Sequence, residues 1–466
     1  MSQRMQTIRS AVLFVVLASG AAAKAQTSNS LNVEFFGNKN DHQGTTTTSY
    51  SACWGYTAPD GREYALLGTR EGTSIIDITD APTLREVVFI PGPVSAWREM
   101  KTYQQHAYIV TENGTDSLAG VQIVDLSNLP NTASLVKTYI WVDTVAGVVT
   151  TIPRAHSVSV EGKYLYLNGG NFNGIRILDL TDPVNPAKAG VYNGPYVHDS
   201  YIRNDTIYAS AISNGGGLDI VDARNKANPQ RIKLLQYPGS GTHNAWTTED
   251  GNYVLTTDEV GSTQKTLKVW DIRNVQNPSK VAEFSNSVAI VHNVFVKGNL
   301  AYVAWYADGL KVVDITNPSN PTLVGYYDSY PGAPVAQYVG AWGAFPYYPS
   351  GKVIISDIQT GLYVLRYKAP DTGPPPPVPA RFALYQNFPN PFNPTTVIRF
   401  DLPRETNATL TLHNVLGQEI RVLRRGTLSA GAHTVQVDAQ SLASGVYIYR
   451  LESSEFVQTH RMVVAK

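Results

Sequence analysis

Short apolar runs broken by polar positions follow one another along most of the chain, and they recur with the same ending. LKVVDITNPSNPTLVG at 310–325 contains an apolar run that ends in Asp314, then a polar turn, Asn-Pro and a second apolar run. IRILDLTDPVNPAKAG at 175–190 and LKVWDIRNVQNPSKVA at 267–282 repeat this order. Such alternation predicts β-strands, and Gly, Asn and Pro at the junctions predict turns. The chain is therefore expected to consist of repeated β units.

The strand-ending Asp marks the length of the repeat. Its copies lie roughly 43 to 54 residues apart, and a seventh copy of the strand has Arg366 in its place. The six copies are Asp77, Asp125, Asp179, Asp222, Asp271 and Asp314. A β repeat of this length is typical of the four-stranded blades of a propeller. Because the Asp recurs in six repeats, we expect it to accept backbone N–H groups in a turn and to be structural.

Seven repeats predict a seven-bladed β-propeller, and its last blade is one strand short. The seventh repeat ends at Tyr367, just before Pro370, without a fourth strand. LNVEFFG at 31–37 resembles TLVGYY at 322–327, a fourth-strand segment. We therefore predict that the N-terminal strand joins the seventh blade and closes the ring, because this removes an exposed sheet edge.

The N-terminus has the pattern of a signal peptide, which we assign to residues 1–25. Arg4 and Arg9 are basic, AVLFVVLASG at 11–20 is apolar but too short to span a bilayer, and Ala23-Lys24-Ala25 fits a cleavage site. No other run approaches transmembrane length. An exported protein is therefore expected.

The propeller is expected over 26–369, and a second domain follows a linker. Residues 370–380 (PDTGPPPPVPA) contain four consecutive prolines, which favour a semi-rigid polyproline spacer. Residues 381–466 contain short alternating runs with Gly and Pro turns. This pattern predicts a small C-terminal β-sandwich, so the whole chain is expected to be all-β.

Charge and motif content exclude several classes of function. Lys plus Arg and Asp plus Glu are equal at 37 each, so no net field attracts nucleic acid or an anionic membrane. Cys53 is the single cysteine, which excludes an intramolecular disulfide. GxSxG, HExxH, Walker-type and CxxC motifs are absent.

Histidines gather at one predicted level of the propeller. When the innermost strands are aligned by their distance to the repeated Asp, four successive repeats begin with His and the other three with Trp54, Trp97 and Trp342. Polar residues follow three of the histidines. The candidate ligand-binding residues are His156, His198, Asp199, His243, Asn244, His292, Asn293 and Trp342.

The same residue types favour a metal site, with a divalent metal ion as the candidate cofactor. Neutral imidazoles are common ligands of transition metals, and carboxylates can complete or orient such a site. The candidate metal ligands are His198, His243, Asp258, Glu259 and His292. Four blades span more than half the ring, so one ion is not expected to bind every His. Hydrogen bonding of each His to the neighbouring blade, and direct acid–base catalysis, remain alternatives.

A second candidate feature is the aromatic stretch at 326–348. It includes Tyr330, Tyr338, Trp342, Phe345, Tyr347 and Tyr348. Such rings either fill the space between blades or form a face for sugars or peptides.

The C-terminal segment resembles the type A C-terminal sorting domain of type IX secretion substrates. The resemblance rests on NFPNPFNP at 387–394, IRFDL at 398–402, NVLG at 414–417 and GVYIYR at 445–450. It implies recognition by the type IX secretion machinery and passage through the outer membrane. It also implies removal of the domain, with attachment of the protein to the cell surface or its release.

The first 370 residues resemble the LVIVD-repeat proteins, and more closely the choice-of-anchor B family. The resemblance rests on CWGY at 53–56, DGREYA at 60–65, WRE at 97–99, DE at 258–259 and HNVFVKG at 292–298. It implies a propeller shared among proteins with different C-terminal anchors, and it implies no activity.

Together these observations predict a secreted, surface-displayed propeller that binds an extracellular protein, peptide or glycan. The alternative is a metal-dependent hydrolase or lyase with its site at the His-lined mouth of the central channel. No nucleic-acid partner and no transmembrane segment are expected.

Overall fold

The computed structural model describes residues 30–44, 48–145, 148–212, 216–260, 265–285, 287–370, 379–439 and 441–466. The predicted signal peptide and most of the predicted linker lie outside these residues. The chain divides into two compact units, residues 1–369 and 370–466. Every element of regular secondary structure in the described part is a β-strand. Accordingly, no helix there has the length and apolar character needed to cross a membrane.

Seven antiparallel sheets, called blades one to seven, and one separate two-stranded sheet form the first unit within the described residues. Blade one contains β3 (Tyr50–Thr57), β4 (Glu63–Thr69), β5 (Gly72–Asp77) and β6 (Arg85–Pro91). Blade two contains β7 (Arg98–Tyr103), β8 (His106–Thr111), β9 (Val121–Asp125) and β10 (Ser134–Tyr139). Blade three contains β13 (Ser157–Glu161), β14 (Tyr164–Asn168), β15 (Ile175–Asp179) and β16 (Ala187–Tyr192).

The remaining four blades continue the same order. Blade four contains β17 (Asp199–Arg203), β18 (Thr206–Ala211), β19 (Gly217–Asp222) and β20 (Gln230–Leu235). Blade five contains β21 (Thr242–Thr247), β22 (Tyr253–Asp258), β23 (Leu267–Asp271) and β24 (Ser279–Phe284). Blade six contains β25 (Val294–Lys297), β26 (Leu300–Ala304), β27 (Leu310–Asp314) and β28 (Thr322–Tyr327). Blade seven contains β29 (Ala341–Phe345), β30 (Val353–Asp357) and β31 (Gly361–Tyr367).

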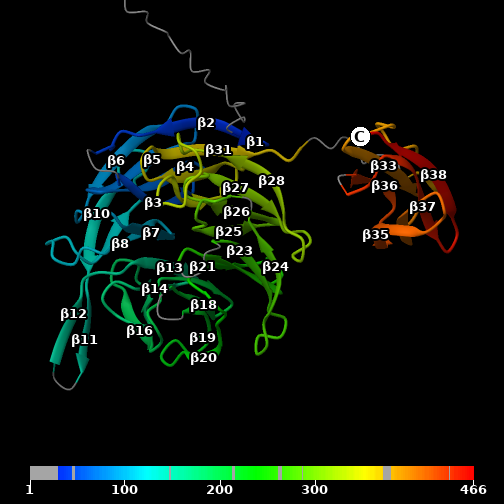
Figure 1. The fold of residues 1–466 in the computed structure, drawn as a ribbon. Helices are drawn as coiled ribbons and strands as arrows, with labels where there is room; N and C mark the ends of the chain where they lie inside the picture. The colour runs from blue at the N-terminus through cyan, green and yellow to red at the C-terminus, as the bar shows by residue number, and fades with distance from the viewer. Residues whose placement is uncertain are drawn as a thin grey trace, which may run out of the picture. The chain divides into compact units, whose positions relative to one another are not determined.

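The first strands of the blades contact one another in a closed cycle. Contacts run from β3 to β7, β13, β17, β21, β25 and β29, and from β29 back to β3. Figure 1 shows these strands around the centre of the unit, with later strands of each blade farther out. The prediction of an all-β propeller is confirmed.

The N-terminal segment completes the last blade, with different bounds from those expected. β2 (Val33–Lys39) pairs antiparallel with β31 as the fourth strand of blade seven. The preceding β1 (Ser30–Leu31) pairs instead with β28 and adds a fifth strand to blade six. Asn32 between them has a φ of 52° and donates a hydrogen bond to the Val324 carbonyl. The N-terminal segment therefore ties two blades together, where the sequence pattern predicted a single strand from Leu31.

The repeated Asp has the predicted structural role. In all six repeats its Oδ1 accepts a hydrogen bond from the backbone N–H two residues later, at 2.7 to 3.0 Å. In the sixth repeat, for example, Thr316 donates to Asp314 over 2.7 Å. This contact fixes the turn between the third and fourth strands of each blade.

A hairpin that the sequence pattern did not predict lies between blades two and three. It consists of β11 (Trp141–Val145) and β12 (Val148–Ile152), which pair with each other. Figure 1 shows it projecting from the ring of blades. It accounts for the longest spacing between two copies of the repeated Asp.

Apolar side chains from adjacent blades interleave and form the core. Between blades one and two, for example, Leu66 and Ile75 pack in one cluster with Met100, Ile109 and Val124. All five are fully buried. Burial of both faces explains why the middle strands are almost entirely apolar, and it holds the channel-lining strands rigidly.

The second unit contains two antiparallel sheets around one core. One sheet has β32 (Ala383–Leu384), β33 (Thr395–Leu402) and β36 (Gly431–Asp438). The other has β34 (Thr406–His413), β35 (Glu419–Leu428), β37 (Gly445–Ser453) and β38 (Val457–Val464). Phe400, Leu410, Tyr449 and Met462 lie in the shared core. This arrangement is the predicted β-sandwich.

Candidate functional site

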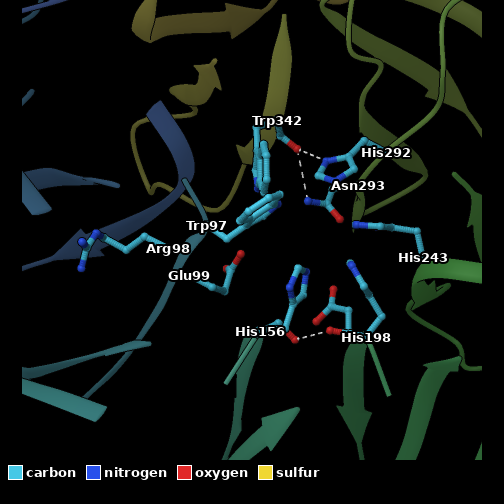
Figure 2. A pocket seen from close by; sticks show the side chains of 11 residues that line it. Trp97, Arg98, Glu99, His156, His198, His243, His292, Asn293 and Trp342 are labelled. Carbon is cyan, nitrogen blue, oxygen red and sulfur yellow. Dashed lines mark hydrogen bonds between the residues drawn. The ribbon is translucent and has the colours of Figure 1, made fainter. Parts of the chain in front are cut away.

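Four histidines from blades three to six lie side by side in the central channel. The ring centroids of His156 and His198 are 3.8 Å apart, those of His198 and His243 are 4.4 Å apart, and those of His243 and His292 are 4.0 Å apart. Trp342 of blade seven continues the row, 5.1 Å from His292. Figure 2 shows the imidazoles turned toward a common centre. We call these four residues the histidine row.

Within the part of the chain that the structure describes, the two ends of the histidine row make short hydrogen bonds, and the two middle rings do not. His292 Nδ1 donates to the Trp342 carbonyl over 2.5 Å, and His156 Nδ1 donates to Glu112 Oε1 over 2.6 Å. The Nδ1 atoms of His198 and His243 are buried and make no hydrogen bond of good geometry among the described residues. Each ring nevertheless interacts with the backbone of the next His in the row, in the neighbouring blade, and this contact opposes the lowering of its pKa.

Burial favours the neutral form of the imidazoles of His198, His243 and His292. Burial lowers the pKa of His198 and of His243 well below the usual range, and the neighbouring imidazoles shift both further. Burial also lowers the pKa of His292, although the charge of Glu259 opposes this shift. Neutral rings keep a lone pair that can accept a proton or bind a metal.

Glu259 faces the middle of the histidine row. It follows β22 directly and is only 8% exposed. Its Oε2 lies 3.7 Å from His243 Nε2, and its Oε1 lies 3.8 Å from His292 Nε2. The Tyr306 hydroxyl donates to Oε1 over 2.6 Å. Burial and the nearby Glu259 charge raise the pKa of Tyr306 well above its usual value, so the phenol remains a donor.

A small cavity is lined by all four residues of the histidine row. Its volume is about 20 Å³, enough for one water molecule or one ion. The side chains around it are those of Trp97, Arg98, Glu99, His156, Ser157, His198, Asp199, His243, His292, Asn293 and Trp342. We call it the inner pocket.

A larger pocket adjoins the inner pocket, and Trp97 and Trp342 line both. Its volume is about 260 Å³, and Thr48, Ala96, Trp97, Glu259, Tyr306, Tyr338, Trp342 and Ile358 line it. Trp97 is 44% exposed and Tyr338 is 55% exposed, whereas other rings of the aromatic stretch, such as Tyr348, are fully buried. We call this larger space the mouth pocket. The aromatic stretch therefore includes both packing residues and pocket residues.

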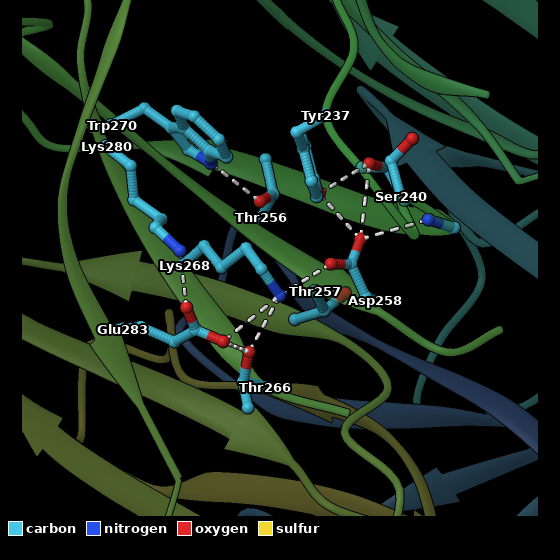
Figure 3. Close-up of polar contacts among 12 residues, drawn as sticks. Tyr237, Ser240, Thr256, Thr257, Asp258, Thr266, Lys268, Trp270, Lys280 and Glu283 are labelled. Atoms are coloured by element: carbon cyan, nitrogen blue, oxygen red, sulfur yellow. Dashed lines mark hydrogen bonds and ion pairs between the residues drawn. The ribbon is translucent and has the colours of Figure 1, made fainter. Parts of the chain in front are cut away.

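Asp258 does not lie with the other candidate metal ligands. Figure 3 shows its carboxylate within blade five, beside Tyr237 and Lys268. Tyr237 donates to it over 2.7 Å, and Lys268 Nζ lies 2.6 Å from it. Successive residues of a strand point to opposite faces, so the side chains of Asp258 and Glu259 separate.

The polar residues that follow the histidines mainly link neighbouring blades. Asn244 donates to Asp199 over 2.7 Å and accepts the backbone N–H of Val294 over 3.0 Å. It therefore joins blades four, five and six. Asn293 donates to the Trp342 carbonyl over 3.2 Å and joins blades six and seven.

Trp54 does not lie at the level of the histidine row, where its distance to the repeated Asp placed it. It pairs with Leu66, as Trp246 pairs with Leu255 in blade five. His243 and Trp342 instead occupy equivalent irregular positions near the start of their strands. Trp54 and Trp246 line a separate pocket of about 230 Å³ with Lys101, Tyr201 and Tyr347. Counting residues cannot detect that β3 begins four residues before Trp54.

The structure adds three site residues that the sequence pattern did not single out for chemistry. Tyr306 lies between β26 and β27, Glu112 follows β8, and Glu99 of β7 faces the inner pocket. Burial raises the pKa of Glu99, while the contacting Lys101 opposes this shift. These residues lie at different positions of their repeats, so no periodic signal marks them.

Two families match parts of the chain. The LVIVD repeat matches residues 154–194 and 290–329, which include blades three and six. The secretion system C-terminal sorting domain matches residues 386–465. The chain therefore contains LVIVD repeats and a type IX sorting domain, which implies export and a secreted or surface-attached location. No functionally curated protein matches the chain.

Several solved structures are similar to the chain at low identity. PorZ, a surface component of the type IX secretion system of Porphyromonas gingivalis, is 12% identical over 87% of this chain, with a TM-score of 0.44. This chain spans 58% of PorZ. A periplasmic gluconolactonase of Pseudomonas aeruginosa is 11% identical over 83% of this chain and 99% of its own, with a TM-score of 0.44. A putative 6-phosphogluconolactonase of Bacteroides uniformis is 11% identical over 87% of this chain and 100% of its own, with a TM-score of 0.46. None of their activities is assigned to this chain.

Proposed function

We propose that the exported propeller is a binding module that holds a terminal sugar of an extracellular glycan in the mouth pocket. The observation that carries the proposal is the pairing of exposed aromatic rings with a buried carboxylate in one pocket. Export through the sorting domain would bring this pocket to the outside of the cell.

The chemistry of the mouth pocket suits a sugar ring. The faces of Trp97 and Tyr338 can pack against the apolar C–H face of a sugar. Glu259 can accept a hydrogen bond from a sugar hydroxyl through Oε1, since a carboxylate oxygen can accept a second hydrogen bond beside the one from Tyr306. The volume of about 260 Å³ is just below the usual range for ligand pockets, so it suits the end of a chain.

The test uses the chain from Gln26 onward, to which soluble oligosaccharides with different terminal sugars are added. Binding is monitored by the change in tryptophan fluorescence. Binding of at least one oligosaccharide is expected, and Tyr338→Ala should weaken it by about 1–2 kcal/mol because a contacting ring is lost. Tyr385→Ala, an exposed aromatic of the other unit, is the matched control.

Two results would overturn the proposal. One is that no oligosaccharide binds at millimolar concentration. The other is that Tyr338→Ala and Trp97→Ala leave the affinity unchanged, which would place binding elsewhere. Unstructured peptides are titrated in parallel. If peptides bind and oligosaccharides do not, and Tyr338→Ala weakens the peptide binding, the ligand is a peptide and the assignment to a glycan is wrong.

A metal-dependent hydrolase or lyase is the second candidate, and one observation favours it. Ligand atoms of His198, His243 and Glu259 lie within 4.8 Å of one another, next to a pocket of substrate size. An enzyme would convert the bound oligosaccharide, and chelation would stop the conversion while the protein stays folded. Chromatography of the recovered oligosaccharide separates the two functions, because a binding module returns it unchanged.

A further inference from the structure

We infer that His198, His243 and Glu259 bind one divalent transition-metal ion, with Zn²⁺ as the best match to the donor set. The inference concerns a metal site and does not require that the mouth pocket binds a glycan. Within the described residues, these three form the group of His, Cys, Asp or Glu side chains whose ligand atoms approach within 4.8 Å of one another.

The distances suit a shared ion better than direct hydrogen bonds. His243 Nε2 and Glu259 Oε2 are 3.7 Å apart, too far for an N–H···O hydrogen bond. Two ligands at about 2.0–2.1 Å from one zinc ion are separated by less than about 4.2 Å. A spacing of 3.7 Å therefore leaves room for an ion between the two atoms.

Among the described residues, the carboxylate in this contact lacks a cationic side chain that would compensate its charge. Glu259 is buried, and its ion pairs within the described part of the chain are with imidazoles, not with Lys or Arg. His198 and His243 place imidazole nitrogens within 4.8 Å of its carboxylate. A buried carboxylate beside two imidazoles is a set of donors that a divalent cation completes.

The carboxylate among these donors is held from behind, as ligands in metal sites are. The Tyr306 hydroxyl holds Glu259 Oε1 and leaves Oε2 toward His243. The Trp342 carbonyl fixes His292 beside the group. Figure 2 shows the rings of His198 and His243 directed toward the same centre. Partners that hold a ligand from behind set its orientation and typically change metal affinity by 10- to 100-fold.

The spaces beside the three donors limit what can bind. The inner pocket, which His198 and His243 line, has a volume of about 20 Å³ and accepts no more than one ion or one water molecule. Glu259 lines the mouth pocket and reaches the group from that side. Two imidazoles and one carboxylate supply three ligands, which leaves a coordination position open toward the mouth pocket.

The test is metal analysis and zinc titration of the chain from Gln26 onward, after chelation and dialysis. We expect about one Zn²⁺ per chain, and His243→Asn and Glu259→Gln should each abolish this stoichiometric binding. Tyr306→Phe should weaken affinity by about 10- to 100-fold. His433→Asn, in the other unit, should bind like the wild type and controls for adventitious binding by the nine histidines.

Absence of stoichiometric zinc in the wild type would overturn the inference, as would unchanged binding in both ligand variants. X-ray absorption on the zinc-loaded wild type keeps the test valid if a variant does not fold. Nitrogen and oxygen neighbours at about 2.0–2.1 Å with imidazole scattering are expected. A shell of oxygen alone would show that zinc is bound elsewhere and would reject the site.

Discussion

Asp258 and Glu259 are neighbours in the sequence, and they lie in two contrasting regions of blade five. Asp258 is completely buried, pairs with Lys268 and accepts a hydrogen bond from Tyr237. Glu259 is also buried, but its second oxygen faces His243 across 3.7 Å. The charge of Asp258 is compensated by a lysine, whereas no Lys or Arg in the described part of the chain forms an ion pair with Glu259.

This difference suggests that one of the two neighbours serves the stability of the fold and the other serves binding. Isolating a buried charge costs several kcal/mol unless it is paired and hydrogen-bonded. Asp258 meets that condition within its own blade, so it belongs to the scaffold. Glu259 has a hydrogen bond from Tyr306 but no Lys or Arg partner among the described residues, so it meets this condition only in part. Buried charges without a full set of partners are typical of functional sites.

The largest expected effect is that of Asp258→Ala on stability. The substitution removes the carboxylate 2.6 Å from the buried Lys268 ammonium, which keeps Glu283 at 3.6 Å and the Thr266 hydroxyl at 2.7 Å. We expect the free energy of unfolding to fall by about 3 kcal/mol, the lower end for breaking a buried ion pair, measured by chemical denaturation. Asp258→Ala combined with Lys268→Met should recover part of this loss. A loss below about 1 kcal/mol would contradict the scaffold role of Asp258.

A smaller effect is expected at Glu63, a second compensated carboxylate, at the contact between blades one and seven. Ser350 donates to it through its hydroxyl over 2.6 Å, and Lys352 donates over 3.0 Å. Burial alone would raise the pKa of Glu63, but these hydrogen bonds outweigh burial and hold the pKa below the usual 4.5. The folded state therefore favours the charged form, whose stabilisation is present above about pH 4.5 and is lost as the pH falls through the folded pKa.

Glu63→Gln tests this pH dependence. At neutral pH the variant should be less stable by about 1.5–3 kcal/mol, because hydrogen bonds to a charged group are lost. The difference from the wild type should shrink as the pH falls below 4.5, as followed by denaturation at several pH values. A difference that does not change with pH would show that the Glu63 charge is not what stabilises the contact.

The smallest effect on stability is expected for Glu259→Gln. The amide oxygen can still accept the Tyr306 hydrogen bond, and no buried Lys or Arg loses its partner. We expect a change in unfolding free energy of less than about 1 kcal/mol in the metal-free protein, measured as for Asp258→Ala. A larger loss of unfolding free energy would show that Glu259, like Asp258, stabilises the fold.

Much of the architecture could be predicted because it depends on local patterns that repeat. The apolar runs, their Asp endings and the Asn-Pro turns specify strands and turns residue by residue. Seven copies then leave few arrangements other than a ring of blades. The sorting domain was recognisable for a similar reason, because motifs such as NFPNPFNP are contiguous. The β11–β12 hairpin was not, because it breaks the repeat.

The candidate site could be predicted only in part. The histidine row followed from its regular position in four repeats, but the partners of that row did not. Tyr306 and Glu112 reach the histidine row from segments without a repeated signal. Trp54 was assigned to the wrong level because an irregularity between Tyr50 and Cys53 displaces it along its strand.

The sequence by itself determined the repeating β units, the histidines at their inner edge and the export signal at the C-terminus. Only the tertiary structure decided which polar side chains meet. Adjacent residues of a strand point to opposite faces, so one position separates Asp258, paired with Lys268, from Glu259, which faces His243. The physical reason is that composition and spacing are local properties, whereas compensation of a buried charge depends on groups that other blades bring into contact.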